Sequence, residues 1–189
     1  MPSSRSILVL LLTAAPAFAE PPADQPRPRR PDVFFVPSPQ DVVEKMLDMA
    51  AVKKDDVVCD LGCGDGRIVV TAATKYGCRG VGYDLNPKCV KLSQDAVAKA
   101  GIEKMVRIEN KDIFTVDLSE VSVATLYLSP AINAKLAPQF AKMKSGSRIV
   151  SHAFTMPGYA PDKTITVKSA EDGISRKLYL FTTPLRKEP

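Results

Sequence analysis

An apolar run that ends in an acid and continues into three alternate glycines limits the possible folds of this chain more than any other feature. The stretch "DDVVCDLGCGDGR" spans residues 55–67, with glycines at positions 62, 64 and 66. Glycine permits positive φ and lets the backbone approach a ligand closely, since it carries no Cβ. A plain turn from strand to helix would account for one glycine. Three of them, between Asp60 and the helix and enclosing Asp65, indicate a ligand-binding turn.

The rest of the chain alternates between strand-like and helix-like patterns. Apolar runs predict strands over residues 55–62, 79–85, 105–113, 121–130 and 147–154, and apolar positions at helical spacing predict helices from residue 40 and over 66–77, 86–101 and 131–146. Ser38 is placed to cap the first helix. Residues 163–184 alternate like a hairpin around Asp172 and Gly173. We therefore predict an α/β fold: a doubly wound, Rossmann-like, mostly parallel seven-stranded sheet with a C-terminal antiparallel hairpin.

The N-terminal residues differ in composition from the rest. Residues 1–19 combine Arg5, an apolar run over 7–12 and the small residues "AFA", an arrangement typical of a signal peptide, which predicts export to a periplasm or the exterior. An N-terminal anchor that faces the cytoplasm, or a start codon placed too early, are the alternatives. The apolar run is short for a span, so no stable membrane span is expected in the mature form. Residues 20–32 read as a Pro-rich linker, and 33–189 as one folded domain.

Charge and cysteine content give weaker indications. The formal net charge is +5, but Lys and Arg are scattered apart from "RPRR", and no nucleic-acid motif accompanies them, so no specific nucleic-acid partner is expected. The four cysteines have no zinc-ligand spacing, and no metal site is expected. Buried free thiols are favoured, with a Cys78–Cys89 bridge as the alternative.

The acids around the glycine loop indicate which nucleotide it binds. Dinucleotide sites use G-x-G-x-x-G to hold an anionic pyrophosphate, whereas this loop reads G-x-G-x-G between carboxylates that would repel phosphate. S-adenosylmethionine, which carries an ammonium and a sulfonium but no phosphate, suits them better. Asp84 ends the next strand, where a carboxylate can accept both ribose hydroxyls, although capping the next helix is the alternative. The expected cofactor-binding residues of the loop and the strand ends are Asp60, Gly62, Cys63, Gly64, Asp65, Gly66, Asp84, Asn86 and Asp112, with a turn or cap as the alternative role for Asp112.

These motifs resemble a known group. In this order, "DLGCGDGRIVVTAA", "GYDLNP", "KDIF", "LYLSP" and "RIVSHAF" resemble class I S-adenosylmethionine-dependent methyltransferases. With "FFVPSPQDVVEKML" before them, the chain is similar to the ATP synthase c-subunit and adenine nucleotide translocase lysine N-methyltransferases and their bacterial relatives. The resemblance implies that Val36 and Pro37 belong to a segment that folds over the cofactor. It also implies methyl transfer to an amine, such as a lysine of a protein substrate. If the N-terminal residues anchor the chain facing the cytoplasm, the Pro-rich linker would let it reach a membrane-associated substrate.

The acceptor end of the site is less defined by the sequence. The resemblance implies that residues 127–130 lie beside the transferred methyl, and the polar groups expected around the acceptor are Tyr127, Ser129 and Asn133, with Pro130 in the same motif. Many amino methyltransferases carry Asn or Asp before Pro-Pro-aromatic here, and this chain has "LSPAIN" instead. His152 is a candidate for proton transfer, with a structural role as the alternative.

Three other functions remain open on the sequence. The first is a methyltransferase of a small molecule, a quinone or a lipid head group, and the second is a non-catalytic module that binds S-adenosylmethionine. The third, a nicotinamide-binding dehydrogenase, is disfavoured by Asp65 and the terminal hairpin. Export would also separate the enzyme from a cofactor that is made in the cytoplasm.

Overall fold

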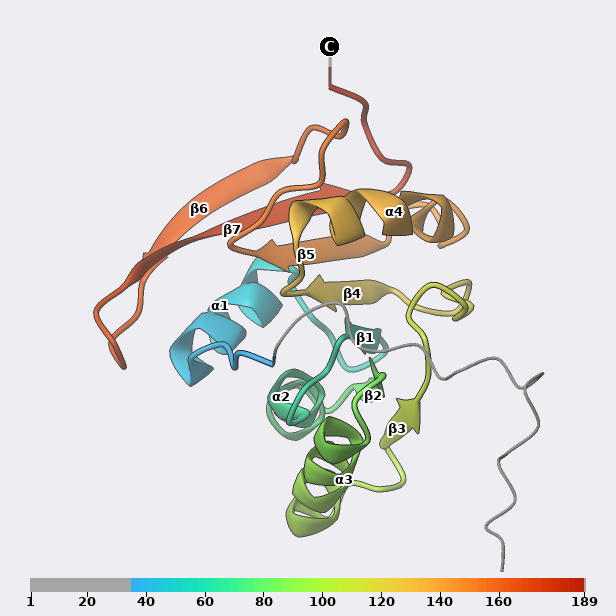
Figure 1. The fold of residues 1–189 in the computed structure, drawn as a ribbon, viewed down its shortest axis with the longest axis vertical. Coiled ribbons are helices and arrows are strands. Elements are labelled where there is room, and N and C mark those ends of the chain that lie inside the picture. Colours follow the sequence, from blue (N-terminus) through green and yellow to red (C-terminus); the bar gives the residue numbers. More distant parts are fainter. Residues whose placement is uncertain (1–34, 189) are drawn as a thin grey trace, which may run out of the picture.

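The computed structural model describes residues 35–188 and has the predicted α/β architecture (Figure 1). The predicted leader (1–19) and linker (20–32), and the start of the predicted domain at residue 33, lie outside the described residues. The helices are α1 (Gln40–Met49), α2 (Arg67–Tyr76), α3 (Pro87–Ala100) and α4 (Pro130–Phe140). The strands are β1 (Val57–Leu61), β2 (Arg79–Asp84), β3 (Val106–Asn110), β4 (Val123–Leu126), β5 (Arg148–His152), β6 (Lys163–Lys168) and β7 (Ser175–Thr182).

The strands form one seven-stranded sheet in the order β3-β2-β1-β4-β5-β7-β6. The five strands from β3 to β5 are parallel, and β7 joins β5 antiparallel, with β6 as its hairpin partner at the edge. The order reverses at β1 and β4, which lie side by side although β2 and β3 separate them in sequence. A crevice forms at the carboxyl ends of the strands at such a reversal, and ligands of doubly wound sheets bind there.

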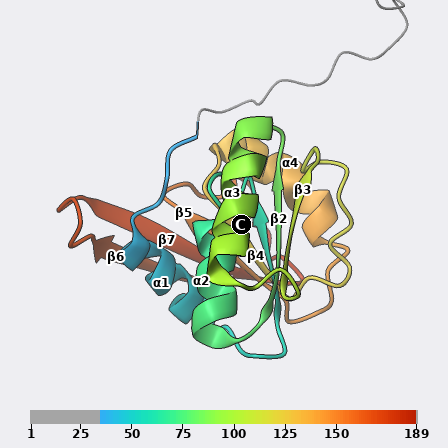
Figure 2. The same ribbon diagram turned by 90° about the horizontal axis from the view of Figure 1, so that it is seen from below.

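Helices cover both faces of the sheet, with α1, α2 and α3 on one side and α4 on the other (Figure 2). Under α1 and α2 lies a core that includes Val43, Met46 and Leu47. Under α4, Leu136 and Phe140 pack against strand residues and against the long β3–β4 connection. None of the helices between residues 35 and 188 is long and apolar enough to span a bilayer.

Two local predictions are wrong. Ser38 does not cap α1: the capping position is Pro39, with no side-chain bond to the helix, and the Ser38 hydroxyl bonds to His152 instead. The fourth helix ends at Phe140, not near Gly146. There the α-helical hydrogen bonds, which join residues four apart, are followed by bonds between residues three apart. Lys142 N–H donates to the Gln139 carbonyl and Met143 N–H to the Phe140 carbonyl, and these bonds end the helix.

Candidate cofactor and acceptor site

A pocket opens at the carboxyl ends of β1, β2 and β4, where the strand order reverses. It is lined by Phe35, Val36, Pro37, Ser38, Asp60, Gly62, Cys63, Asp65, Arg67, Ile68, Asp84, Leu85, Asn86, Cys89, Asp112, Ile113, Phe114, Tyr127, Leu128 and Ile132. Ten of the residues singled out in the sequence are in this set: Val36, Pro37, Asp60, Gly62, Cys63, Asp65, Asp84, Asn86, Asp112 and Tyr127.

The glycine loop has the backbone that its sequence predicts. Gly62, Gly64 and Gly66 have φ values of +83°, +55° and +79°, in the left-handed region that favours glycine. The N–H groups of Gly62 and Cys63 both donate to the Tyr83 carbonyl, at 2.8 and 2.9 Å, which fastens the loop to the end of β2. Gly66 is the capping residue of α2. The loop therefore links β1 to α2 along one wall of the pocket.

Asp84 connects the glycine loop to the start of α3. Its Oδ2 accepts a hydrogen bond from Gly64 N–H at 2.9 Å, and its Oδ1 accepts one from Asn86 N–H at 2.8 Å. Asn86 itself caps α3 by accepting from Lys88 N–H at 3.0 Å. The capping role considered for Asp84 is thus shared: Asn86 caps α3 directly, and Asp84 holds Asn86. Each Asp84 oxygen keeps a lone pair that could accept a ribose hydroxyl.

Asp60 is an almost fully buried carboxyl group at the floor of the pocket. Its Oδ1 accepts from the Thr125 hydroxyl at 2.7 Å. Burial raises the pKa of Asp60 to about 7; the Thr125 bond opposes this shift, and the charges of Asp84 and Asp65 add to it. A cation bound in the pocket would favour the ionised form of this carboxyl.

Asp65 is paired within its own loop. Arg67 donates to both Asp65 oxygens, with Nη2–Oδ2 at 2.6 Å and Nε–Oδ1 at 3.0 Å. The remaining nitrogen of Arg67, Nη1, donates to the Ser38 carbonyl at 2.7 Å. The sequence did not point to Arg67, although its position two residues after Asp65 was a possible signal.

Residues 35–38, which we call the covering segment, form another wall of the pocket. The ring of Phe35 lies so close to Gly64 that a Cβ on this glycine would be 2.1 Å from Phe35 Cε2. This part of the structure agrees with the implied role of Val36 and Pro37. No pattern in the sequence singled out Phe35 itself.

Tyr127 continues the pocket wall beyond β4 and is part of an aromatic stack. Its ring centroid lies 3.9 Å from that of His152, and Phe154 follows at 6.2 Å from Tyr127. His152 is fully buried, and its Nδ1 lies 2.8 Å from the Ser38 hydroxyl. Burial, together with the charge of Arg176, lowers the pKa of His152 to about 4, so the imidazole is neutral at neutral pH. The histidine supports Tyr127 and Ser38 and is not among the residues that line the pocket.

The other acceptor candidates lie outside the pocket wall. Ser129 is the capping residue of α4, and Pro130 begins that helix. Asn133 is fully buried, and its Nδ2 donates to the carbonyl of Thr155 at 3.1 Å and to that of Phe154 at 3.3 Å. These bonds tie α4 to the loop after β5. The Asn133 side chain is therefore used to hold the fold together and is not part of the pocket lining.

The four cysteines are free and buried, as their spacing in the sequence favoured. Burial raises the pKa of Cys63, so the thiol in the glycine loop is protonated at neutral pH.

The charges of the pocket fit S-adenosylmethionine. Four carboxyl groups line it, from Asp60, Asp65, Asp84 and Asp112, and Arg67 is the single cationic side chain among the described lining residues. Asp84 would hold the ribose, the glycine loop and Asp60 the cationic amino-acid part, and Asp112 the adenine side. Phosphate would meet net negative charge here. When bound, the cofactor supplies a methyl group activated by sulfonium.

Comparison with known proteins agrees with this geometry. The family model described as the ANTKMT methyltransferase domain matches residues 60–163. A protein-lysine N-methyltransferase of Saccharolobus islandicus (strain REY15A) is 39% identical over 154 residues, which cover 80% of this chain and 94% of that protein. The ATP synthase c-subunit lysine N-methyltransferase of Mus musculus is 31% identical over 131 residues, 69% of this chain and 52% of the mouse protein. The chain thus spans about half the length of this mammalian relative.

A solved structure is also similar over most of the chain. The Salinibacter ruber protein described as an RNA methyltransferase in complex with S-adenosyl-L-homocysteine is 41% identical, with a TM-score of 0.72, and the match covers 82% of this chain and 96% of that one. The pocket, the family match and these relatives agree on a methyltransferase whose methyl donor is S-adenosylmethionine. This chain belongs to the ANTKMT methyltransferase-domain family.

Proposed function

We propose that the enzyme N-methylates a lysine of a protein substrate. The observation that carries the proposal is Tyr127, which lines the acidic pocket and stacks with His152 and Phe154, because an aromatic ring suits an alkyl-ammonium side chain. Phe154 is 40% exposed, so part of this stack is open to a partner. The protein-lysine N-methyltransferase of Saccharolobus islandicus, which matches over nearly its whole length, supports the same acceptor class.

The residues present act on the acceptor mainly through position and desolvation. A lysine would accept the methyl group as a neutral amine, so its ammonium would first have to release a proton to water; the new C–N bond would form as the methyl–sulfonium bond breaks. Apolar surroundings lower the pKa of an amine, and Leu128 and Ile132, which lie in the chain just after Tyr127, are apolar residues of the pocket lining. Neutral His152 brings no positive charge beside the amine, and it keeps the Tyr127 ring in place. Alignment of amine and methyl supplies the remaining acceleration.

RNA is the acceptor that the Salinibacter ruber protein's description raises. In the described part of this chain the pocket carries four carboxyl groups against one paired arginine, which disfavours a polyanion at its mouth. A small-molecule acceptor would use the same cofactor residues, so the acceptor must be identified directly.

The test is to incubate the purified protein with S-adenosylmethionine labelled in its methyl group and an extract of soluble and membrane fractions. We expect label in protein, resistant to nuclease and to lipid extraction, on lysine residues identified by mass spectrometry. Asp84→Ala is the control that should lower labelling at limiting cofactor concentration. Nuclease-sensitive label would overturn the proposal in favour of RNA, and extractable label in favour of a lipid or quinone. Cofactor binding without any labelling would indicate a non-catalytic module.

We also propose that the N-terminal residues 1–19 direct the protein to the membrane, either as an export signal or as an anchor that faces the cytoplasm. Their composition supports this, and the cytoplasmic origin of the cofactor favours the anchor. Cell fractionation with protease protection, comparing the full chain with a chain that starts at residue 20, tests it. Equal recovery of both chains in the soluble cytoplasmic fraction would contradict the proposal.

A further inference from the structure

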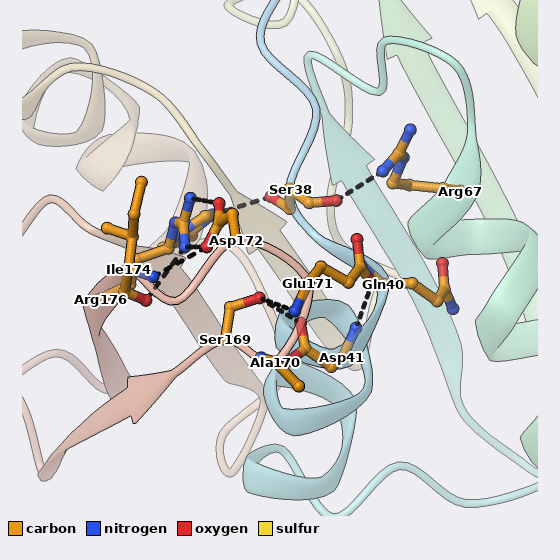
Figure 3. Close-up of polar contacts among 11 residues, drawn as sticks. Ser38, Gln40, Asp41, Arg67, Ser169, Ala170, Glu171, Asp172, Ile174 and Arg176 are labelled. Atoms are coloured by element: carbon orange, nitrogen blue, oxygen red, sulfur yellow. Dashed lines mark hydrogen bonds and ion pairs between the residues drawn. The ribbon is translucent and has the colours of Figure 1, made fainter.

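The tip of the β6–β7 hairpin, residues 169–174, lies against the start of α1 although about 130 residues separate them in sequence (Figure 3). Glu171 Oε1 accepts hydrogen bonds from the N–H groups of Gln40, at 2.6 Å, and Asp41, at 3.2 Å. In return, Asp41 accepts from Ala170 N–H at 2.6 Å and from the Ser169 hydroxyl at 2.9 Å. We call these bonds the hairpin–helix contact. Each side satisfies backbone donors of the other.

The contact replaces a cap that the helix lacks. The first N–H groups of an α-helix have no partner within the helix, and a side chain at the capping position usually serves them. In α1 that position is Pro39, which makes no such bond. Glu171 supplies the acceptor from another element, and its charge is favourable at the positive end of the helix dipole.

Asp41 makes the contact reciprocal. Its hydrogen bond from Ala170 N–H is the largest influence on its carboxyl group and lowers the pKa of Asp41, with the Ser169 hydroxyl contributing in the same direction. The ionised carboxylate is therefore the form that holds the hairpin. The side chain of Ser169 is in turn buried, and its hydroxyl also accepts from Glu171 N–H at 3.1 Å.

The same helix start is continuous with the covering segment of the cofactor pocket. Ser38, two residues before Gln40, is bonded to Arg67 through its carbonyl and to His152 through its hydroxyl. Phe35 and Val36, by contrast, are 43% and 59% exposed. The position of the covering segment therefore depends on Ser38 and on the orientation of the first turn of α1, which the hairpin tip fixes.

We propose that Glu171 is a positioning residue of the cofactor site, which holds the covering segment over the pocket through the start of α1. The inference rests on the pocket being the cofactor site and not on the identity of the acceptor. Glu171 does not touch the cofactor. It raises the fraction of protein in which the covering segment is in place, and apparent affinity scales with that fraction.

The first test compares Glu171→Ala, Glu171→Gln and Glu120→Gln. Affinity for S-adenosylhomocysteine is measured by calorimetry, and amide exchange at Val36 and Ser38 is measured by NMR without ligand. We expect Glu171→Ala to raise the Kd about three- to tenfold and to speed exchange at both amides, as the loss of a helix cap would. Glu171→Gln keeps the acceptor oxygen and should stay within about twofold of wild type. Glu120 is an exposed partner of Lys144 outside the pocket, so its variant should change neither quantity.

A second pair of variants acts from the helix side. Gln40→Pro removes the closer of the two N–H groups from which Glu171 accepts. The first helical position tolerates proline, and Pro39 already has the extended ψ of 147° that a following proline requires. Gln40→Ala removes only the side-chain bond to Thr71. The proposal expects a raised Kd for Gln40→Pro relative to Gln40→Ala. Unchanged affinity in both Glu171→Ala and Gln40→Pro would overturn it, whatever the exchange rates. A raised Kd in which Glu171→Gln equals Glu171→Ala would overturn the role of the acceptor oxygen.

Discussion

The carboxylate of Asp84 is held in place before any ligand arrives. It accepts backbone N–H groups from Gly64 and Asn86, so the glycine loop and the start of α3 both orient it. Such preorganisation reduces the side-chain entropy that the protein must lose when a ligand binds.

We expect Asp84→Ala to weaken the binding of S-adenosylhomocysteine by roughly 1 to 3 kcal/mol, because charge-assisted hydrogen bonds to the ribose would be lost. Calorimetry measures this directly. Asp95→Ala, which removes an exposed carboxylate of α3 paired with Lys91, is the matched control. Equal affinities for the two variants would contradict the placement of the ribose.

Asp60 should make cofactor binding depend on pH. Its folded pKa of about 7 means that the ligand-free protein keeps a proton there below that pH, and a bound cation would displace it. The native state thus binds more protons than the unfolded chain, whose Asp has its ordinary pKa. The stability of the ligand-free protein therefore falls as pH rises toward about 7, while affinity for S-adenosylmethionine rises over the same range and levels off above about 8.

Calorimetry in two buffers of different ionisation enthalpy should detect proton release on binding below about pH 7. Asp60→Asn has no proton to release at this position and should lose most of the pH dependence. A wild-type affinity that does not change between about pH 6 and 8 would contradict this role.

Tyr127 should matter more for transfer than for binding. The ring is supported by neutral His152 from behind and lies in the pocket wall toward the acceptor. We expect Tyr127→Ala to lower kcat by at least about tenfold with a smaller change in cofactor Kd, because misalignment of the acceptor costs rate. Tyr127→Phe keeps the stacked ring but removes the hydroxyl, so it distinguishes the contribution of the ring from that of the hydroxyl. Equal losses in kcat and affinity would indicate that the ring only packs.

Local sequence signals pointed to many of the residues that line the pocket, but not to the contacts that lie behind it. Asp60, Asp84 and the glycines lie at strand ends and in a short loop, where spacing alone determines their position. The bond between Ser38 and His152 joins residues 114 positions apart, and no periodic pattern carries that information. Asn133 was expected at the acceptor because it follows "LSP", but its helical position turns it toward the loop after β5.

The glycine loop connects β1 to α2, and two of its glycines make room for different neighbouring residues. A Cβ on Gly64 would meet the ring of Phe35 at 2.1 Å, whereas a Cβ on Gly66 would meet Ser93 Cβ of α3 at 2.6 Å. Both residues have positive φ, so each substitution adds backbone strain.

We therefore expect Gly66→Ala to lower the free energy of unfolding by roughly 1 to 3 kcal/mol, since α2 and α3 must separate slightly. Gly64→Ala should lower it less, because the exposed Phe35 ring can move, but it should weaken cofactor binding more. Chemical denaturation and calorimetry on both variants measure the two effects. A larger loss of stability in Gly64→Ala, or a larger loss of affinity in Gly66→Ala, would contradict the separate roles of the two glycines.

Helix and strand patterns were reliable wherever one face of the element is buried. The apolar positions of α1 predicted its buried face, and Val42, Val43, Met46 and Leu47 are indeed fully buried. The ends of elements were less predictable. The start of α1 is capped by Glu171 from the hairpin, a solution that the sequence around Ser38 does not show.

A charged cluster lies at the amino ends of the strands, at the opposite edge of the sheet from the pocket. There Arg148 pairs with Asp56, which also accepts from the Ser122 hydroxyl and from Lys53 N–H, each at 2.7 Å. Burial alone would raise the pKa of Asp56, but these bonds outweigh it and the pKa is lowered. The cluster connects the starts of β1, β4 and β5, and none of its residues lines the pocket.

We expect Arg148→Met to cost about 3 kcal/mol of stability, because a buried carboxylate loses its charged partner and keeps only neutral donors. Cofactor affinity, measured well below the unfolding temperature, should not change. Because the folded pKa of Asp56 is below its unfolded value, the stabilisation is present above about pH 4 and is lost as pH falls through the folded pKa. Thermal unfolding of wild type and variant across pH checks both statements. A variant as stable as wild type at pH 7 would contradict them.

Alternation of strands and helices was enough to predict the class of the whole fold, including the terminal hairpin. The sequence patterns did not determine how the hairpin would meet the rest of the molecule. Its tip reaches α1 through a few hydrogen bonds, made by polar residues that are common on any exposed turn, such as Ser169 and Glu171.

The hairpin–helix contact has a consequence for the order in which a chain made from its N-terminus can assemble. The start of α1 leaves the ribosome long before residues 169–171 are made. The bonds from Gln40 and Asp41 to these residues can therefore form only after about 130 further residues have been synthesised. A nascent polypeptide that already contains the glycine loop and Asp84 therefore lacks the hairpin–helix contact that would hold the covering segment in place.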